Sequence, residues 1–364
     1  MEKTRPARAL VGALYGVVAG TLATFSAIGC ATTAPFTDSR GMVRPESIAV
    51  LEAVEIGGME QWILIRGTDR SNPVLLWLHG GPGAAHMPVA QGWAEELEEY
   101  FLVVHWDQRG AGKSNPPDFD ETTMTLERFV QDVHEVTEYL KDRLETEKMY
   151  LLGHSWGAEL GLHVVQQRPW NYFAYIGVSQ VVNRGLGEDI AYSHLTRAII
   201  KEGSPREKRK LLELGPPPYH EHSRYVSFMS LINNHGGSYD TGFLRLAVEA
   251  LRAPEYRIPD YRAWLRGANR GSGPMWNQAE YRNFDARRHV PRLELPVFFI
   301  MGARDLNTPL EAVRRYFDVL DAPRGKELIV FDNAAHTPFF QDEQRFVEVL
   351  VRIRECPRPG ESTG

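Results

Sequence analysis

The stretch from Met149 to Gly157, Met-Tyr-Leu-Leu-Gly-His-Ser-Trp-Gly, decides the fold of this 364-residue chain. Its apolar start is typical of a buried strand, the motif Gly153-His154-Ser155-Trp156-Gly157 follows, and a helical pattern continues from Ala158 to Gln167. A serine hydroxyl is a weak nucleophile, and a sharp turn between strand and helix can present it to a base. The stretch therefore predicts Ser155 as a catalytic nucleophile, with an ordinary tight turn as the alternative.

A catalytic serine needs a base and a group that orients the base. Among the 12 histidines, His336 follows the strand-like run Glu327 to Phe331, where the base is expected. Asp305 follows the strand-like run Val297 to Met301 and is the candidate acid, with a helix N-cap as its alternative role. Because Thr308-Pro309-Leu310-Glu311 has a capping-box pattern with proline at the first helical position, we expect the cap there and favour the catalytic role for Asp305.

A tetrahedral intermediate carries negative charge on the former carbonyl oxygen, and fixed backbone N–H groups stabilise it. The strand-like run Val74 to Leu78 is followed by His79-Gly80-Gly81-Pro82-Gly83, whose glycines allow backbone amides to turn toward the nucleophile. We expect Gly81 and Trp156 to form this oxyanion hole, with an ordinary glycine-rich turn as the alternative. His154 is expected to pack or to line the pocket.

Short apolar runs alternate with segments long enough for helices along most of the chain. Besides the runs named above, they include Phe101 to Trp106 and Tyr172 to Val178, and Glu127 to Leu144 has helical apolar spacing. Ser47 to Ile56 and Met59 to Arg66, joined by two glycines, predict an edge hairpin. The alternation predicts an α/β fold, a mostly parallel sheet with helices on both faces.

The alternation breaks between Val182 and Val290, where polar and aromatic helical pieces are interrupted by glycines and prolines. We interpret residues 182–290 as an inserted helical cap. The core is then formed by residues 47–181 and 291–356, and residues 357–364 are expected to be a flexible tail.

The N-terminus resembles an export signal. Basic residues precede an apolar stretch that ends in Ala27-Ile28-Gly29-Cys30, similar to a bacterial lipobox with cysteine as the lipidated residue. Residues 1–30 are therefore expected to be a signal peptide with lipidation at Cys30, so that the protein is exported and membrane-anchored. An uncleaved anchor and a cytosolic apolar helix are the alternatives. Residues 31–46, which lack apolar periodicity, are expected to be a linker.

Composition excludes several classes of protein. Lys and Arg number 41 against 47 Asp and Glu, a formal charge of −6 that argues against a nucleic-acid partner. With only two cysteines, neither a disulfide framework nor a cysteine zinc cluster is available, and no metal or cofactor is expected.

The run Gly110 to Ser114 resembles the end of a phosphate-binding loop, but the spacing of its glycines does not match that motif. We interpret Asp107-Gln108-Arg109-Gly110 as a turn that supports the site.

The glycine-rich loop after Leu78, the Ser155 motif and the run from Asp107 to Ser114 together resemble the proline iminopeptidase group of α/β-hydrolases, over roughly residues 50–355. The resemblance implies a Ser-Asp-His triad and removal of an N-terminal residue, often proline, from peptides without a metal. It also implies that acidic cap residues bind the free amino group of the substrate.

No cap residue stands out as substrate-binding. The available acids are expected to be solvated charges: Glu188, Asp189, Glu202, Glu213 and Glu221. The cap aromatics could form an acyl pocket, but core packing is the expected role of each: Trp264, Trp276, Tyr219, Tyr225 and Phe228.

The hypothesis from sequence is a serine hydrolase acting on a small molecule or short peptide through an acyl-enzyme, first an aminopeptidase of the prolyl type. The alternative is an esterase or lactonase on small acyl substrates, followed by a non-catalytic binding protein of the same fold.

Overall fold

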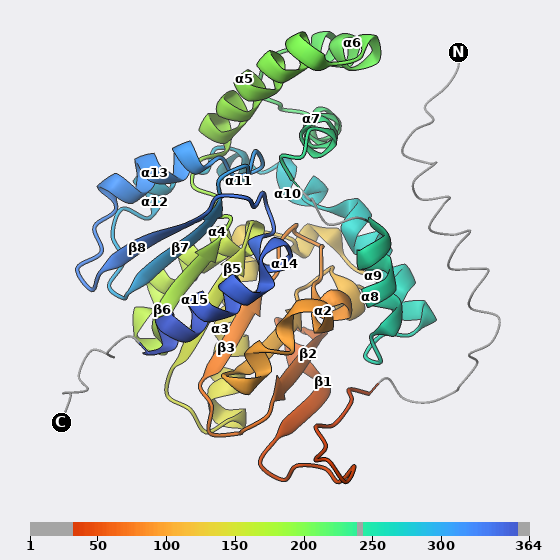
Figure 1. Cartoon of the computed structure of the whole chain (residues 1–364), viewed down its shortest axis with the longest axis vertical. Coiled ribbons are helices and arrows are strands. Elements are labelled where there is room, and N and C mark those ends of the chain that lie inside the picture. The colour runs from red at the N-terminus through yellow and green to blue at the C-terminus, as the bar shows by residue number, and fades with distance from the viewer. Residues whose placement is uncertain (1–31, 239–242, 356–364) are drawn as a thin grey trace. The chain divides into compact units, whose positions relative to one another are not determined.

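The computed structural model describes residues 32–238 and 243–355, which contain an eight-stranded sheet in the order β1-β2-β4-β3-β5-β6-β7-β8 (Figure 1). β1 and β2 pair antiparallel at one edge, β2 is antiparallel to β4, and the remaining pairs are parallel. The strands are β1 (Ile48–Ile56), β2 (Met59–Gly67), β3 (Val74–Leu78), β4 (Leu102–Asp107), β5 (Met149–His154), β6 (Tyr172–Val178), β7 (Val297–Gly302) and β8 (Lys326–Phe331). The predicted strands and edge hairpin are confirmed within one or two residues at each end.

The chain reverses its direction of travel across the sheet at β3, which lies between β4 and β5. In such sheets, ligands bind beyond the carboxyl ends of the strands at this reversal. The parallel register pairs Leu78 at the end of β3 with Gly153 near the end of β5. The glycine-rich loop and the serine motif therefore emerge side by side from the same edge.

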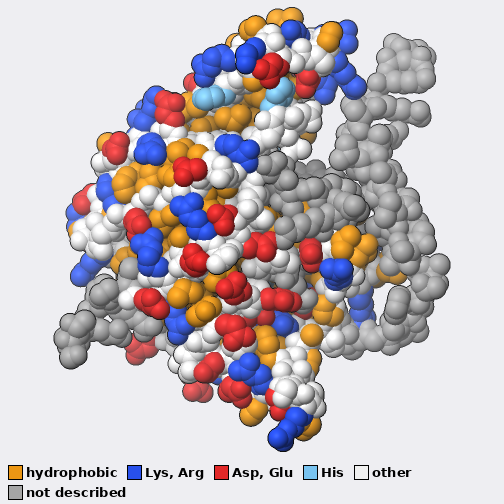
Figure 2. All heavy atoms as spheres, in the orientation of Figure 1, with side chains coloured by type: hydrophobic (Ala, Val, Ile, Leu, Met, Phe, Trp, Pro, Cys, Tyr) orange, Lys and Arg blue, Asp and Glu red, His pale blue; other side chains and the backbone are white. Residues whose placement is uncertain are grey.

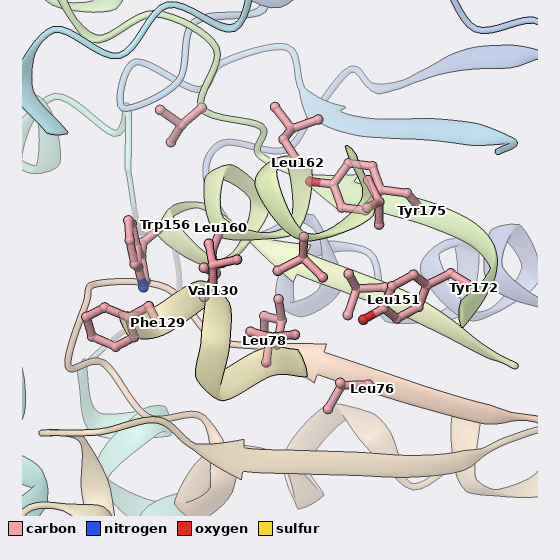
Figure 3. Close-up of a cluster of buried hydrophobic side chains, with 14 of the residues drawn as sticks. Leu76, Leu78, Phe129, Val130, Leu151, Trp156, Leu160, Leu162, Tyr172 and Tyr175 are labelled. Carbon is pink, nitrogen blue, oxygen red and sulfur yellow. The ribbon is translucent and has the colours of Figure 1, made fainter. Parts of the chain in front are cut away.

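Helices cover both faces of the sheet, as predicted. One face packs on α3 (Leu126–Arg143), α4 (Trp156–Gln167) and α13 (Leu310–Val319), and the other on α2 (Gln91–Ala94) and α15 (Glu343–Glu355). Alternation along β3 explains the two layers, because Leu76 and Leu78 belong to the first cluster and Leu75 and Trp77 to the second. Figure 3 shows Phe129 and Val130 of α3 and Leu160 of α4 gathered around Leu78.

A helical insertion separates β6 from β7, which confirms the predicted cap. Its first three helices share a small apolar core of their own, and α9 packs against the core domain, where Asn115 donates to the carbonyl of Ala263 at 2.7 Å. The insertion contains α5 (Arg184–Glu202), α6 (Pro205–Leu214), α7 (His222–Asn234), α8 (Phe243–Arg252), α9 (Ile258–Arg270), α10 (Gly273–Trp276), α11 (Ala279–Arg282) and α12 (Ala286–His289). On the face in Figure 2, basic and acidic side chains are interspersed over core and insertion alike.

The segment before β1, for which the sequence predicts a linker, contacts the core at Arg66. The guanidinium of Arg66 donates to Thr33 Oγ1 at 2.6 Å and to the Ala34 carbonyl at 2.7 Å, and it lies 4.7 Å from the centroid of the Phe36 ring. A largely buried guanidinium needs acceptors, and this segment supplies two of them in addition to Glu98, whose Oε1 accepts from Arg66 Nε at 2.8 Å.

The predictions for the signal peptide, for Cys30 and for the tail after residue 356 fall outside the described residues. Among residues 32–238 and 243–355, no helix is both long and apolar enough to cross a membrane.

Candidate active site

Ser155 lies at the sharp turn between β5 and α4, with backbone angles φ 55° and ψ −114°. Such left-handed angles are strained for a residue with a side chain and are typical of functional turns. The glycines of the motif make the turn possible, because a Cβ on Gly153 would lie 2.2 Å from the Gly157 carbonyl oxygen and one on Gly157 would lie 2.1 Å from that of Leu78. Around Ser155, the backbones of β5, of the first turn of α4 and of the end of β3 are therefore in close contact.

Asp305 and His336 are in contact. Asp305 follows β7, His336 lies between β8 and α14 (Pro338–Gln341), and the Nδ1–H of His336 donates to Asp305 Oδ2 over 2.8 Å. Both side chains are buried. Burial alone would raise the pKa of Asp305, but the neighbouring His336 and the donors of Thr308 outweigh it and lower that pKa, so the carboxylate stays ionised.

The expected helix cap at Thr308 is wrong. α13 begins at Leu310, and its cap residue is Pro309, whose side chain makes no capping hydrogen bond. Thr308 instead donates its hydroxyl to Asp305 Oδ2 at 2.6 Å and its backbone N–H to Oδ1 at 3.0 Å. A carboxylate that accepts these bonds can still orient an imidazole. The sequence pattern at Thr308 therefore corresponds to a turn closed by hydrogen bonds to Asp305 instead of to a helix cap.

The backbone of His336 is tied to the strand ends next to Ser155. Its carbonyl accepts from the ring Nε2–H of His154 and from the hydroxyl of Ser179, each at 2.9 Å. Burial lowers the pKa of His154 to about 3, so its imidazole stays neutral. His154 packs as expected, but its bond to the His336 loop could not be predicted, because the two residues are far apart in sequence.

The glycine-rich loop borders the same cavity as the serine. Gly81, Ser155 and Trp156 all line it, and a Cβ on Gly80 would lie 3.3 Å from the Cβ of Ser155. Gly81 has a φ of 116°, which favours glycine. Trp156 is the first residue of α4, so its backbone N–H has no partner within the helix.

Gln108 bridges the glycine-rich loop after β3 and the start of α4. Its Nε2 donates to the His79 carbonyl at 3.1 Å, and its Oε1 accepts from the ring N–H of Trp156 at 3.1 Å. The turn that begins at Asp107 thus contacts both the glycine-rich loop and the residue after the serine.

The cavity beside Ser155 measures about 70 Å³. Most of its wall comes from the insertion and from the loop after β7, and polar groups such as those of Asn183 and Asn307 line it together with apolar side chains. Its lining includes Val181, Val182, Phe228, Met229, Ala312 and Val313. Phe228 and Tyr225, expected in the core, both border this cavity, while Trp276 stacks on Tyr225 at 4.1 Å between ring centroids.

Glu188 on α5 lines this cavity and is only 8% exposed, so the expectation of a solvated charge is wrong for this residue. Burial raises the pKa of its carboxyl to about 7, opposed in part by the backbone N–H of Tyr219, which donates to it at 3.3 Å, and by Arg184. Arg184 itself is paired with the buried Glu159. The other acids expected to be solvated are exposed: Asp189, Glu202, Glu213 and Glu221.

A family model described as alpha/beta hydrolase fold matches residues 73–182. The chain is also 36% identical over 315 residues to the protein named probable aminopeptidase YbaC from Bacillus subtilis (strain 168), a match that covers 84% of this chain and 96% of that relative. The chain belongs to the α/β-hydrolase superfamily, in its proline iminopeptidase-like group.

Other α/β-hydrolases of this group are more distant. The proline iminopeptidase of Heyndrickxia coagulans is 24% identical over 293 residues, which cover 76% of this chain and 88% of that relative. The crystal structure of the proline iminopeptidase of Mycobacterium smegmatis has a TM-score of 0.60 at 21% identity and covers 83% of this chain and 97% of that one, a likeness of fold alone. Membership in this group confirms the resemblance drawn from the motifs.

Proposed function

We propose that this hydrolase is a serine aminopeptidase that releases the N-terminal residue of a short peptide through an acyl-enzyme. The observation that carries the proposal is the carboxyl group of Glu188, which lines the cavity that Ser155 also borders. A hydrolase for simple esters has no need of a buried acid there, whereas a free α-ammonium group needs an anionic partner.

In the proposed reaction, Ser155 Oγ attacks the carbonyl carbon of the first residue while His336 takes the serine proton. Asp305, bonded to His336 Nδ1 at 2.8 Å, holds the ring and stabilises its charged form. The N–H groups of Gly81 and Trp156 stabilise the oxyanion. His336 then protonates the leaving amine, and water, activated by the same imidazole, releases the residue from Ser155.

Glu188 would bind the α-ammonium of the substrate. Its carboxyl group accepts one backbone N–H, and the nearby Arg184 is engaged by Glu159, so an ammonium group would add a cation to a buried acid. The apolar part of the cavity wall, which includes Val181, Phe228 and Val313, suits a small apolar side chain or ring.

The test compares prolyl anilide, N-acetylprolyl anilide and a short-chain nitrophenyl ester as substrates of the full-length protein. Ser155→Ala should abolish cleavage of the prolyl anilide. Glu188→Gln should raise KM for it at least about 10-fold, because a hydrogen bond to a charged group contributes about 1.5–3 kcal/mol. The matched control is Asp189→Asn, since Asp189 is the exposed neighbour of Glu188.

Anilide cleavage that survives Ser155→Ala would refute the serine mechanism. Ser155-dependent cleavage of the ester alone would refute the peptidase assignment in favour of an esterase or lactonase on small acyl substrates. Equal rates with the free and acetylated anilides would count against amine recognition by Glu188.

We also propose, from the sequence, that the protein is exported and anchored to a membrane through a lipid on Cys30. Mass spectrometry of the membrane fraction should find a mature chain that begins with modified Cys30. An unmodified Cys30 still joined to Gly29 would contradict this.

A further inference from the structure

A short turn of the insertion contacts both loops that carry the proposed acid and base. The turn consists of Gly237 and Ser238 after α7. The Gly237 carbonyl accepts from the Leu306 N–H at 2.8 Å, and the Ser238 carbonyl accepts from the His336 N–H at 3.0 Å. The insertion is thus bonded to the residue after Asp305 and to His336 itself.

A third bond reinforces the first contact. The side-chain amide of Asn307 donates to Ser238 Oγ at 2.9 Å, while its backbone N–H donates to Asp305 Oδ1 at 2.8 Å. A movement of Ser238 would therefore displace Asn307, whose backbone N–H helps to hold the Asp305 carboxylate.

The turn fits its site closely. Ser238 is 4% exposed, and a Cβ on Gly237 would lie 2.8 Å from three side-chain atoms of Leu306. The N–H of Gly237 donates to the Ile232 carbonyl at 3.1 Å, which fastens the turn to α7. A larger residue at position 237 must displace either the turn or the loop after Asp305.

The peptide groups of His336 are held on both sides. Ser238 accepts from its N–H, and His154 and Ser179 donate to its carbonyl oxygen. His154 ends β5 and Ser179 directly follows β6, so both belong to the core, and among these three partners Ser238 is the contribution of the insertion. The position of the imidazole depends on core and insertion together.

We propose that the Gly237–Ser238 turn is a positioning element for the catalytic pair Asp305 and His336, which makes the insertion part of the machinery that aligns the base. This inference rests on the proposed function and deepens it. α7, to which the turn is fastened, also supplies Tyr225, Phe228 and Met229 to the cavity wall, so one helix contacts the substrate site and supports the base.

The test uses Gly237→Ala and Ser238→Ala in the full-length protein. The matched control is Gly185→Ala, since Gly185 is an exposed glycine of the same insertion where a Cβ would meet only one atom, Asn183 Oδ1, at 3.8 Å. Assays are kcat and KM for prolyl anilide and the rate of inactivation by a fluorophosphonate probe. The low-field proton resonance of the Asp305–His336 hydrogen bond is followed by NMR, because a merely structural role would leave it unchanged.

Gly237→Ala should lower kcat and the inactivation rate about 10- to 100-fold, since misplacement by about 1 Å can cost about 100-fold. The fold-change in KM should be smaller than that in kcat, and the low-field resonance should shift or disappear. Ser238→Ala, which removes one hydrogen bond, should lower kcat about 2- to 12-fold. Gly185→Ala should match the wild type in every assay.

A folded Gly237→Ala protein with wild-type kcat and resonance would overturn the inference. If that variant does not fold, Ser238→Ala decides, and an unchanged kcat would overturn it. The Ser155→Ala arm separates the two proposals. If Ser155→Ala retains activity, the proposed function fails; if it is inactive while both turn variants behave as wild type, only the positioning role fails.

Discussion

The carboxylate of Asp132 offers a sharp test of what holds the antiparallel edge of the sheet to its helix. Asp132 on α3 is fully buried and accepts hydrogen bonds from Arg109 in the turn after β4, from Gln61 on β2 and from Arg128 on its own helix. The Arg109 guanidinium, bonded through Nη2 at 2.8 Å, is 2% exposed. One carboxylate thus joins a helix, a strand and the turn that supports the site.

Asp132→Ala would leave the Arg109 guanidinium buried without this carboxylate. Breaking a buried ion pair by removing one partner costs about 3–5 kcal/mol in the free energy of unfolding. Since domains unfold with about 5–15 kcal/mol in total, this loss should be a large fraction of the stability. The control is Glu311→Ala, because the side chains of Glu311 and its partner Arg315 are 55% and 54% exposed, and such pairs contribute at most about 1 kcal/mol.

The assay is equilibrium unfolding in urea, followed by tryptophan fluorescence and by circular dichroism. Asp132→Ala should strongly lower the urea concentration at the midpoint of unfolding, without changing the dependence of the unfolding free energy on urea concentration. Because the cost comes from an unpaired buried charge, adding Arg109→Met to that variant should restore part of the lost stability. An Asp132→Ala protein within about 1 kcal/mol of the wild type would refute the reasoning, as would a double variant less stable than the single one.

Gly157→Ala should lose about 3 kcal/mol or fail to fold, because the added Cβ would lie 2.1 Å from the Leu78 carbonyl oxygen; a wild-type urea midpoint would contradict this. Gln108→Leu should lower kcat for prolyl anilide about 10-fold with little change in KM, because it unlinks the His79 loop from Trp156; stopped-flow or steady-state kinetics that show an unchanged kcat would argue against that support. KM for prolyl anilide should fall as pH rises through about 7, the value to which burial raises the pKa of Glu188, because only the ionised carboxylate attracts the ammonium group. The same pH profile measured with Glu188→Gln should lack this step, and a step that persists would assign it to another group.

Much of the fold could be predicted from short-range signals in the chain. The strand from Met149, the elbow at Ser155 and the helix after it follow from apolar periodicity and from glycines at fixed offsets. Such signals are local, because a buried strand must be apolar and a sharp turn must avoid side chains, whatever the rest of the chain does. The helical insertion was also predicted, because its polar and aromatic helical segments interrupt the alternation of strand-like and helical segments on either side of it.

Local patterns failed where a side chain had two possible partners. Thr308 has the sequence of a helix cap, yet its hydroxyl bonds to Asp305, since the buried carboxylate lies within reach and the helix begins later. Glu188 has the sequence of a surface acid, yet it lines the cavity. Thr308 has two competing local roles, a helix cap or a bond to the carboxylate three residues before it, whereas the position of Glu188 depends on how α5 packs against distant elements.

By itself, the sequence therefore determined the α/β sheet, the place of the serine motif within it and the order in which the candidate residues occur. Only the tertiary structure decided that Asp305 meets His336, that Glu188 borders the cavity beside Ser155, and that the Gly237–Ser238 turn contacts both loops. The physical reason is the sequence separation over which each kind of interaction acts. Periodicity and turn chemistry act over a few residues of the chain. The site is assembled from loops as far apart in the sequence as Gly81 and His336, and their meeting depends on how every layer packs.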